Sequence, residues 1–150
     1  MDIQLICDES IRESLEKKLT KKGFTINDKA AFVFYEKNYA EKKYIFAKDN
    51  EYNISMLKFE NIIYFESDDK RTFVVTEEKK LEVKEKLYEL EKQLLLKNFF
   101  RINKSHIINI LKINKIIPWI GSKLVLEMDN GDKLSVTRTY YENFKKRIGL

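Results

Sequence analysis

The chain has 150 residues, with 29 lysines and arginines against 24 aspartates and glutamates, and a formal net charge of +5. This length fits one domain, or one domain with a small appendage, and 43% hydrophobic residues are enough for a packed core, which excludes a disordered chain. No apolar run reaches the roughly 18 residues of a membrane-spanning helix. Because acidic residues lie among the first ten, we expect no secretory leader. These features predict a globular cytoplasmic protein.

Residues 1–49 follow a short α/β pattern. Apolar runs predict strands at 3–7, 31–35 and 44–46. Ile11, Leu15 and Leu19 recur every four residues, which predicts a helix that ends before Gly23. We therefore expect a small βαβ-like N-terminal unit that ends at residue 49.

From residue 50 the pattern changes to short strands separated by polar turns, which is typical of a mainly β domain. The expected strands are 52–56, 62–66, 72–76, 80–83, 100–102, 113–119, 124–128 and 133–137. Val83, Leu87, Leu90 and Leu94 form one apolar stripe, which predicts a helix with Glu85 on its outer side. Asn130-Gly131 predicts a hairpin with a type I′ turn, and a last helix is expected over 140–148.

Residues that commonly carry catalysis are scarce in this chain. It has a single histidine, His106, and a single cysteine, Cys7, far apart in sequence, which excludes a disulfide framework and gives no metal-ligand spacing. Its four glycines do not form a phosphate-binding loop. We therefore expect no enzyme, no cofactor, no metal site and no small-molecule substrate.

The positive charge is concentrated in the last third of the chain. Residues 51–96 hold 8 basic and 11 acidic side chains, a net charge of −3, whereas residues 97–150 hold 11 and 4, a net charge of +7. Several basic residues lie in predicted turns, namely Lys70, Arg71, Arg101, Lys104 and Arg138. Each of these could be an ordinary surface charge, but together on one edge they could contact DNA phosphates and bases.

The run Phe-Phe-Arg-Ile-Asn-Lys-Ser-His-Ile-Ile-Asn at 99–109 resembles the central signature of the LytTR (LytR/AlgR-type) DNA-binding domain. Three further blocks resemble the same family in the same order, at 59–67, 87–91 and 134–140. The resemblance covers about residues 50–150, two thirds of the chain. It implies a bacterial protein with an elongated β-sheet domain of about ten strands and one or two short helices, which binds DNA through loops.

The resemblance also implies which side chains contact DNA. The loop after the block at 59–67 maps to Lys70, Arg71 and Thr72, the central signature to Arg101, Asn103 and Lys104, and the block at 134–140 to Arg138. An arginine can bind guanine O6 and N7 with two hydrogen bonds, and a lysine can reach the same atoms or a phosphate. Asn103 stands where the family usually has histidine, and Thr137 where serine is common.

Domains of this family often follow a phosphorylated receiver domain, and residues 1–49 resemble the start of one. However, Glu36 stands where the phosphoacceptor aspartate would be, and 49 residues are too few for a five-stranded receiver. We therefore expect a shortened interaction or dimerisation unit.

Two functional hypotheses follow. In the first, the chain is a response-regulator-like transcription regulator that binds double-stranded DNA at a promoter direct repeat as a homodimer. In the alternative, residues 1–50 bind a regulatory partner protein, a membrane-bound one among the options, and DNA binding is weak or absent.

Overall fold

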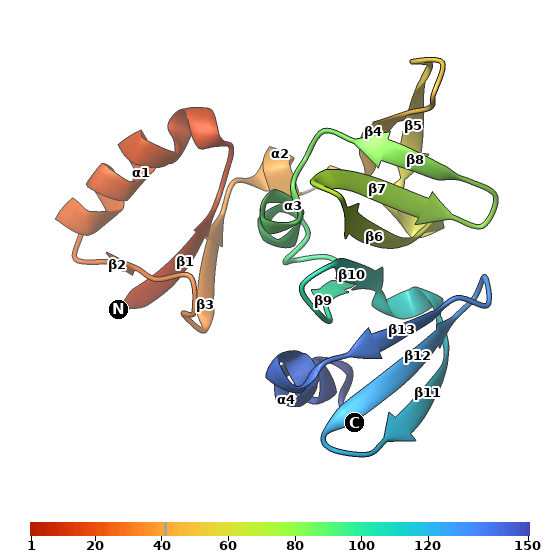
Figure 1. Ribbon diagram of the computed structural model, residues 1–150. Helices are drawn as coiled ribbons and strands as arrows, with labels where there is room; N and C mark the ends of the chain where they lie inside the picture. Colours follow the sequence, from red (N-terminus) through yellow and green to blue (C-terminus); the bar gives the residue numbers. More distant parts are fainter. Residues whose placement is uncertain (41) are drawn as a thin grey trace. The chain divides into compact units, whose positions relative to one another are not determined.

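A computed structural model describes residues 1–40 and 42–150 (Figure 1). Its contacts divide the chain into an N-terminal unit, Met1–Lys42, and a C-terminal unit, Lys43–Leu150. In the part that is described, no helix is long and apolar enough to cross a membrane. The mainly β fold class with a small α/β unit before it is confirmed.

The N-terminal unit is a three-stranded parallel sheet with a helix on it. It consists of β1 (Asp2–Ile6), α1 (Glu9–Lys21), β2 (Thr25–Ile26), β3 (Phe32–Tyr35) and the short α2 (Lys37–Ala40), with strand order β2-β1-β3. These are the first three strands of the order 2-1-3-4-5 found in one kind of doubly wound sheet. As predicted, a helix follows the first strand and ends before Gly23, which has φ +91°. The two-residue strand β2 that comes next was not predicted.

The C-terminal unit has ten strands in two sheets. The seven-stranded sheet has the order β5-β4-β8-β7-β6-β10-β9, and the three-stranded sheet has the order β11-β12-β13. The strands are β4 (Tyr44–Lys48), β5 (Ile54–Lys58), β6 (Ile62–Asp68), β7 (Arg71–Thr76), β8 (Lys80–Val83), β9 (Phe99–Arg101), β10 (His106–Asn109), β11 (Ile113–Trp119), β12 (Lys123–Met128) and β13 (Lys133–Val136). The helical elements are η1 (Phe59–Asn61), α3 (Leu87–Gln93), η2 (Ile110–Lys112) and α4 (Arg138–Ile148).

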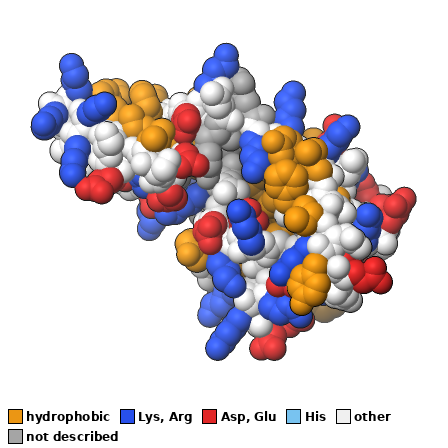
Figure 2. All heavy atoms as spheres, turned by 90° about the horizontal axis from the view of Figure 1, so that it is seen from above, with side chains coloured by type: hydrophobic (Ala, Val, Ile, Leu, Met, Phe, Trp, Pro, Cys, Tyr) orange, Lys and Arg blue, Asp and Glu red, His pale blue; other side chains and the backbone are white. Residues whose placement is uncertain are grey.

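Strand β6 contributes to both hydrophobic clusters of the C-terminal unit because both of its faces are buried. Phe65 packs in one cluster with the apolar face of α3, including Leu90. Ile63 packs in the other with the three-stranded sheet and Phe144 of α4. The uninterrupted apolar run at the start of this strand is what burial on both faces requires. Figure 2 shows that basic side chains are spread over the visible surface between apolar areas.

The unit boundary, the start of α3 and the burial of Glu85 differ from the sequence-based expectation. The division between the units falls after Lys42 rather than at residue 49, because β4 pairs with β5 in the large sheet. The predicted helix begins at Leu87, since Val83 ends β8. Glu85 lies in the connection between β8 and α3 with a buried side chain, 8% exposed, instead of facing solvent.

The hairpin between β12 and β13 forms as predicted, but its turn is not type I′. Of the turn residues only Gly131 has positive φ, +88°, whereas type I′ requires two. The backbone N–H of Gly131 donates to Met128 O at 2.8 Å, which describes a three-residue loop. The Asn130 side chain accepts from the N–H of Asp132 and donates to its carboxylate, which stabilises this alternative.

Candidate nucleic-acid interface

The turn between β6 and β7 presents Lys70 at its tip. Asp68 pairs with Arg71 across the hairpin, so Asp69 and Lys70 are its two connecting residues. Their φ values are +47° and +64°, the left-handed region that type I′ turns use. Neither residue is a glycine, so the turn is strained. The Lys70 side chain is exposed, and no ion pair involves it among the described residues.

Arg71 and Thr72, which follow Lys70, are less available for contact with DNA. Arg71 Nη2 lies 2.6 Å from Glu82 Oε2, and the Arg71 guanidinium stacks 5.0 Å from the centre of the Phe73 ring. The hydrogen bond and charge of Glu82 raise the pKa of Arg71 above its usual value. Thr72 is 2% exposed. The expected DNA contact at Thr72 does not fit this burial.

The loop between β9 and β10 is held in shape by Arg101. Its Nε donates to Asn103 O at 3.1 Å and its Nη2 donates to Lys104 O at 2.7 Å. Its Nη1 lies 3.1 Å from Glu91 Oε2 on α3. All three contacts are internal, so Arg101 fixes the backbone that carries Lys104, whose own side chain is exposed.

Asn103 is also used inside the protein. Its Nδ2 donates to Ser135 O at 2.8 Å, and its Oδ1 accepts from the N–H of Ser105 at 2.8 Å. Because the amide cannot satisfy both contacts if it is reversed, its orientation is fixed. The same Oδ1 lies 3.1 Å from His106 Nδ1. An asparagine at this position can therefore shape the loop without contacting a base.

His106 connects Asn103 to an ionic cluster on the large sheet. Its Nε2 lies 3.2 Å from Glu66 Oε1, and Lys80 Nζ lies 2.8 Å from Glu66 Oε2. Burial of Glu66 acts to raise the pKa of its carboxyl, but the contacts with Lys80 and His106 outweigh burial and lower it. The ionised Glu66 therefore stabilises the base of the loop.

Arg138 is the first residue of α4, directly after β13. Its side chain is exposed and makes no ion pair within the described part of the chain. A cation in the first turn of a helix is disfavoured by the helix dipole, and no acidic residue lies there to offset it. Arg138, like Lys70, thus occupies a position that stability alone would give to another residue.

Hydrogen bonds join the three connections into one surface, here called the basic edge: the β6–β7 turn, the β9–β10 loop and the start of α4. The N–H of Ser67 donates to Ser105 O at 2.8 Å, which ties the first two. The N–H of Thr137 donates to Ile102 O at 3.0 Å, and Asn103 bonds Ser135 O, which tie the second and third. In Figure 1 the three connections lie on the same side of the C-terminal unit.

Three of the seven residues expected at the site are exposed on the basic edge without an internal partner in the described structure: Lys70, Lys104 and Arg138. Arg71 is exposed but paired, Arg101 and Asn103 support the loop, and Thr72 is buried. Sequence reasoning missed Glu66 and Glu91 as supporting residues. Only their spatial contacts identify them, since neither lies near its partner in sequence.

The chain is similar to known regulators over the same region. Residues 52–149 match the LytTr DNA-binding domain family. The transcriptional regulatory protein LytR of Staphylococcus aureus (strain N315) is 36% identical over 97 residues, which are 65% of this chain and 39% of that protein. The sensory transduction protein LytT of Bacillus anthracis is 35% identical over 100 residues, 67% of this chain and 41% of that protein. This chain therefore matches only about two fifths of the length of these relatives.

A solved structure agrees with the sequence matches. The LytTr DNA-binding domain of a methyl-accepting/DNA response regulator from Bacillus cereus superposes with a TM-score of 0.68 at 32% identity, covering 73% of this chain and 99% of that one. The family match over residues 52–149 includes nine of the ten strands of the C-terminal unit, all except β4, and the whole basic edge. The chain belongs to the LytTR family of DNA-binding domains.

Proposed function

We propose that this protein regulates transcription by binding double-stranded DNA through the basic edge, with Arg138, Lys104 and Lys70 in the major groove. The observation that carries the proposal is the set of hydrogen bonds that hold three exposed basic side chains on one edge. Exposed cations on rigid backbone can reach base edges without a large loss of entropy on binding.

The three side chains have different roles in this proposal. The Arg138 guanidinium binds guanine O6 and N7 with two hydrogen bonds, which gives base specificity. Lys104 and Lys70 reach a base or a phosphate as point charges. Arg71 contributes if DNA displaces Glu82 from it. Arg101 and Asn103 act as positioning residues for Lys104.

Binding to a selected DNA site tests the proposal. Sites are recovered from a random DNA pool, and the affinity of the full chain is measured by fluorescence anisotropy at several salt concentrations. We expect affinity to fall steeply with salt, because released counterions dominate it. Arg138→Ala, Lys104→Ala and Lys70→Ala should each weaken binding, whereas Lys133→Ala, an exposed lysine of the same unit outside the basic edge, should not. Unchanged affinity in all three variants would show that the basic edge is not the DNA interface.

For the N-terminal unit we propose self-association through β3, which would place two chains on a direct repeat. This strand is one of the two outer strands of its sheet, the longer one, and contains no charged residue. Phe32, Phe34 and Tyr35 are 63%, 46% and 51% exposed. Outer strands usually carry charges that prevent pairing, so an uncharged one favours pairing with the same strand of a second copy.

Sedimentation of the full chain tests this second role. A concentration-dependent dimer that Phe34→Lys converts to monomer supports the pairing of β3. The same variant should keep its affinity for a single half-site and lose affinity only for the repeat. A wild-type chain that stays monomeric in solution and also binds the repeat as independent monomers would refute this role.

A further inference from the structure

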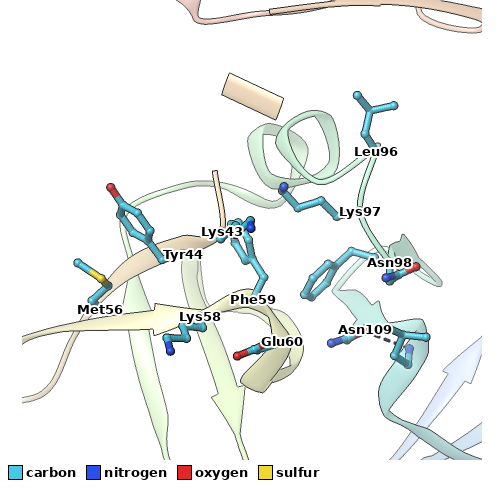
Figure 3. A pocket seen from close by; sticks show the side chains of 12 residues that line it. Lys43, Tyr44, Met56, Lys58, Phe59, Glu60, Leu96, Lys97, Asn98 and Asn109 are labelled. Atoms are coloured by element: carbon cyan, nitrogen blue, oxygen red, sulfur yellow. Dashed lines mark hydrogen bonds between the residues drawn. The ribbon is translucent and has the colours of Figure 1, made fainter. Parts of the chain in front are cut away.

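The C-terminal unit carries a hollow of about 560 Å³ that the basic edge does not use (Figure 3). Its lining comes from the start of β4, from β5 and η1, from the segment between α3 and β9, and from the end of β10. Phe59 and Phe99 are both nearly buried and pack edge to face with ring centres 6.0 Å apart. Their rings give the hollow an apolar floor of a size that suits one or two large side chains.

The hollow is apolar beyond its floor as well. Met56 and Leu111 line it and are 60% and 69% exposed. The apolar surface continues past the hollow along the outer face of β4 and β5, because Phe46 pairs directly with Met56 and Ile54 lies two residues further along β5. Phe46 and Ile54 are 49% and 74% exposed. Exposed apolar groups gathered in this way are typical of a surface that binds another molecule.

The charged groups around the hollow are mainly positive. Lys43, Lys58 and Lys97 line it, against one acidic residue, Glu60. Within the described residues no ion pair involves Lys43 or Lys58. Lys97 Nζ lies 5.5 Å from the centre of the Phe59 ring, as can be followed in Figure 3. This charge pattern complements an occupant that has both apolar and acidic groups.

The hollow lies at the other end of β6 and β10 from the basic edge. Strand β6 starts at Ile62, beside η1, and ends at the β6–β7 turn. Strand β10 starts at His106, beside the β9–β10 loop, and ends at Asn109, which lines the hollow. Since β6 spans about 20 Å, DNA on the basic edge would leave the hollow open.

We propose that the hollow and the adjoining face of β4 and β5 bind an acidic peptide segment of a partner protein, with bulky apolar side chains over Phe59 and Phe99 and carboxylates facing Lys43 and Lys58. The extent of the apolar surface favours a peptide over a small anion, because Phe46 and Ile54 lie outside the hollow. A second copy of this chain fits less well, since a two-fold contact here would bring Lys43 and Lys58 near their own counterparts.

A model peptide tests the proposal on the full chain. The probe is a fluorescein-labelled nine-residue peptide in which leucine and phenylalanine alternate with aspartate, and its binding is followed by fluorescence polarisation. We expect saturable binding that weakens with salt. The double variant Lys43→Glu/Lys58→Glu should weaken it at least tenfold, and so should Met56→Asp. The control Lys79→Glu/Lys133→Glu makes the same change in charge at exposed sites elsewhere in the unit and should bind as the wild type does.

DNA affinity measured on the same samples shows that each variant is folded, and it separates failure of this proposal from failure of the proposed DNA binding. No saturable binding of the probe would overturn the proposal. Equal binding of a peptide with lysine in place of aspartate would overturn the role of the charges. A dimer of the chain that Met56→Asp abolishes in sedimentation would assign this face to a second copy instead.

Discussion

Replacing Lys70 by glycine should stabilise the fold while weakening DNA binding. Lys70 has φ +64° at the tip of the β6–β7 hairpin, next to Asp69 at +47°. The left-handed conformation costs an L-residue about 1–2 kcal/mol, and glycine avoids this cost. Strain of this kind persists where the side chain has a function. Here that function would be the placement of a cation at the most prominent point of the turn.

The size of the effect follows from two opposing contributions. Lys70→Gly removes about 1–2 kcal/mol of strain, but the freer unfolded chain costs about 0.5–1 kcal/mol. The hydrogen bond from Lys86 Nζ, 2.8 Å from Lys70 O, involves the backbone and is retained. We therefore expect the free energy of unfolding to rise by about 0.5–1 kcal/mol, or the Tm by about 3 °C for a chain of this length.

Urea unfolding and DNA titration measure the two effects separately. Loss of one phosphate contact should lower the slope of log affinity against log salt by about 0.9. Lys79→Gly is the matched control, since Lys79 is an exposed turn residue outside the left-handed region. It should destabilise the protein by about 0.5–1 kcal/mol and leave DNA affinity unchanged. If Lys70→Gly destabilises the fold as Lys79→Gly does, the strain argument is wrong.

Three further predictions concern the basic edge. Arg138→Ala should weaken binding to the selected site by about 1–3 kcal/mol and relax preference at one base pair, with an unchanged or slightly higher Tm because a cation leaves the first turn of α4. Asn103→Ala should lower the free energy of unfolding by about 1–3 kcal/mol, since Ser135 O loses its donor, and should lower DNA affinity through the loop that Asn103 is proposed to position. Glu66→Gln should change the acid stability of the fold. The folded-state pKa of Glu66 is lowered from its usual 4.5, so its contribution is complete above that value and is lost as the pH falls through the folded pKa.

Each of these has its own measurement. Equal discrimination by Arg138→Ala and wild type in a competition with single-base variants would exclude base contact by Arg138. Urea unfolding of Asn103→Ala without a loss of stability would exclude its role in the loop. For Glu66→Gln, unfolding from pH 7 down to strongly acidic pH should show the wild-type advantage shrinking only at acidic pH. A constant difference across that range would refute the assignment.

Sequence reasoning located most strands because their burial follows local patterns. The expected strands at 80–83 and 113–119 coincide with β8 and β11. Strand β10 was missed because its residues follow a polar loop within one continuous motif, with no turn signal to separate them. The start of α3 was misplaced because Val83 fits the spacing of a helix as well as the alternation of β8 with Leu81.

The sequence predicted which loops form the site but not which of their side chains are exposed. Neighbouring residues of a strand point to opposite faces, so the burial of Thr72 beside the exposed Arg71 depends on the register of β7 and not on residue type. Arg101 was expected on DNA because it lies in the central signature, beside Lys104 in a basic turn. Its internal role depends on Glu91, which the fold brings to it from α3. Contacts between side chains of separate elements, such as Arg101 and Glu91, cannot be recognised in a single sequence.

The bonds that join the three connections also fix the distances between the three basic residues proposed to contact DNA. With Ser67 bonded to Ser105 and Thr137 bonded to Ile102, the separations between Lys70, Lys104 and Arg138 cannot adjust one at a time. One inserted base pair moves the following bases by about 3.4 Å along the duplex axis. If the basic edge binds DNA as proposed, the domain measures the spacing between the contacted bases, and operators should tolerate substitutions at those positions better than insertions between them.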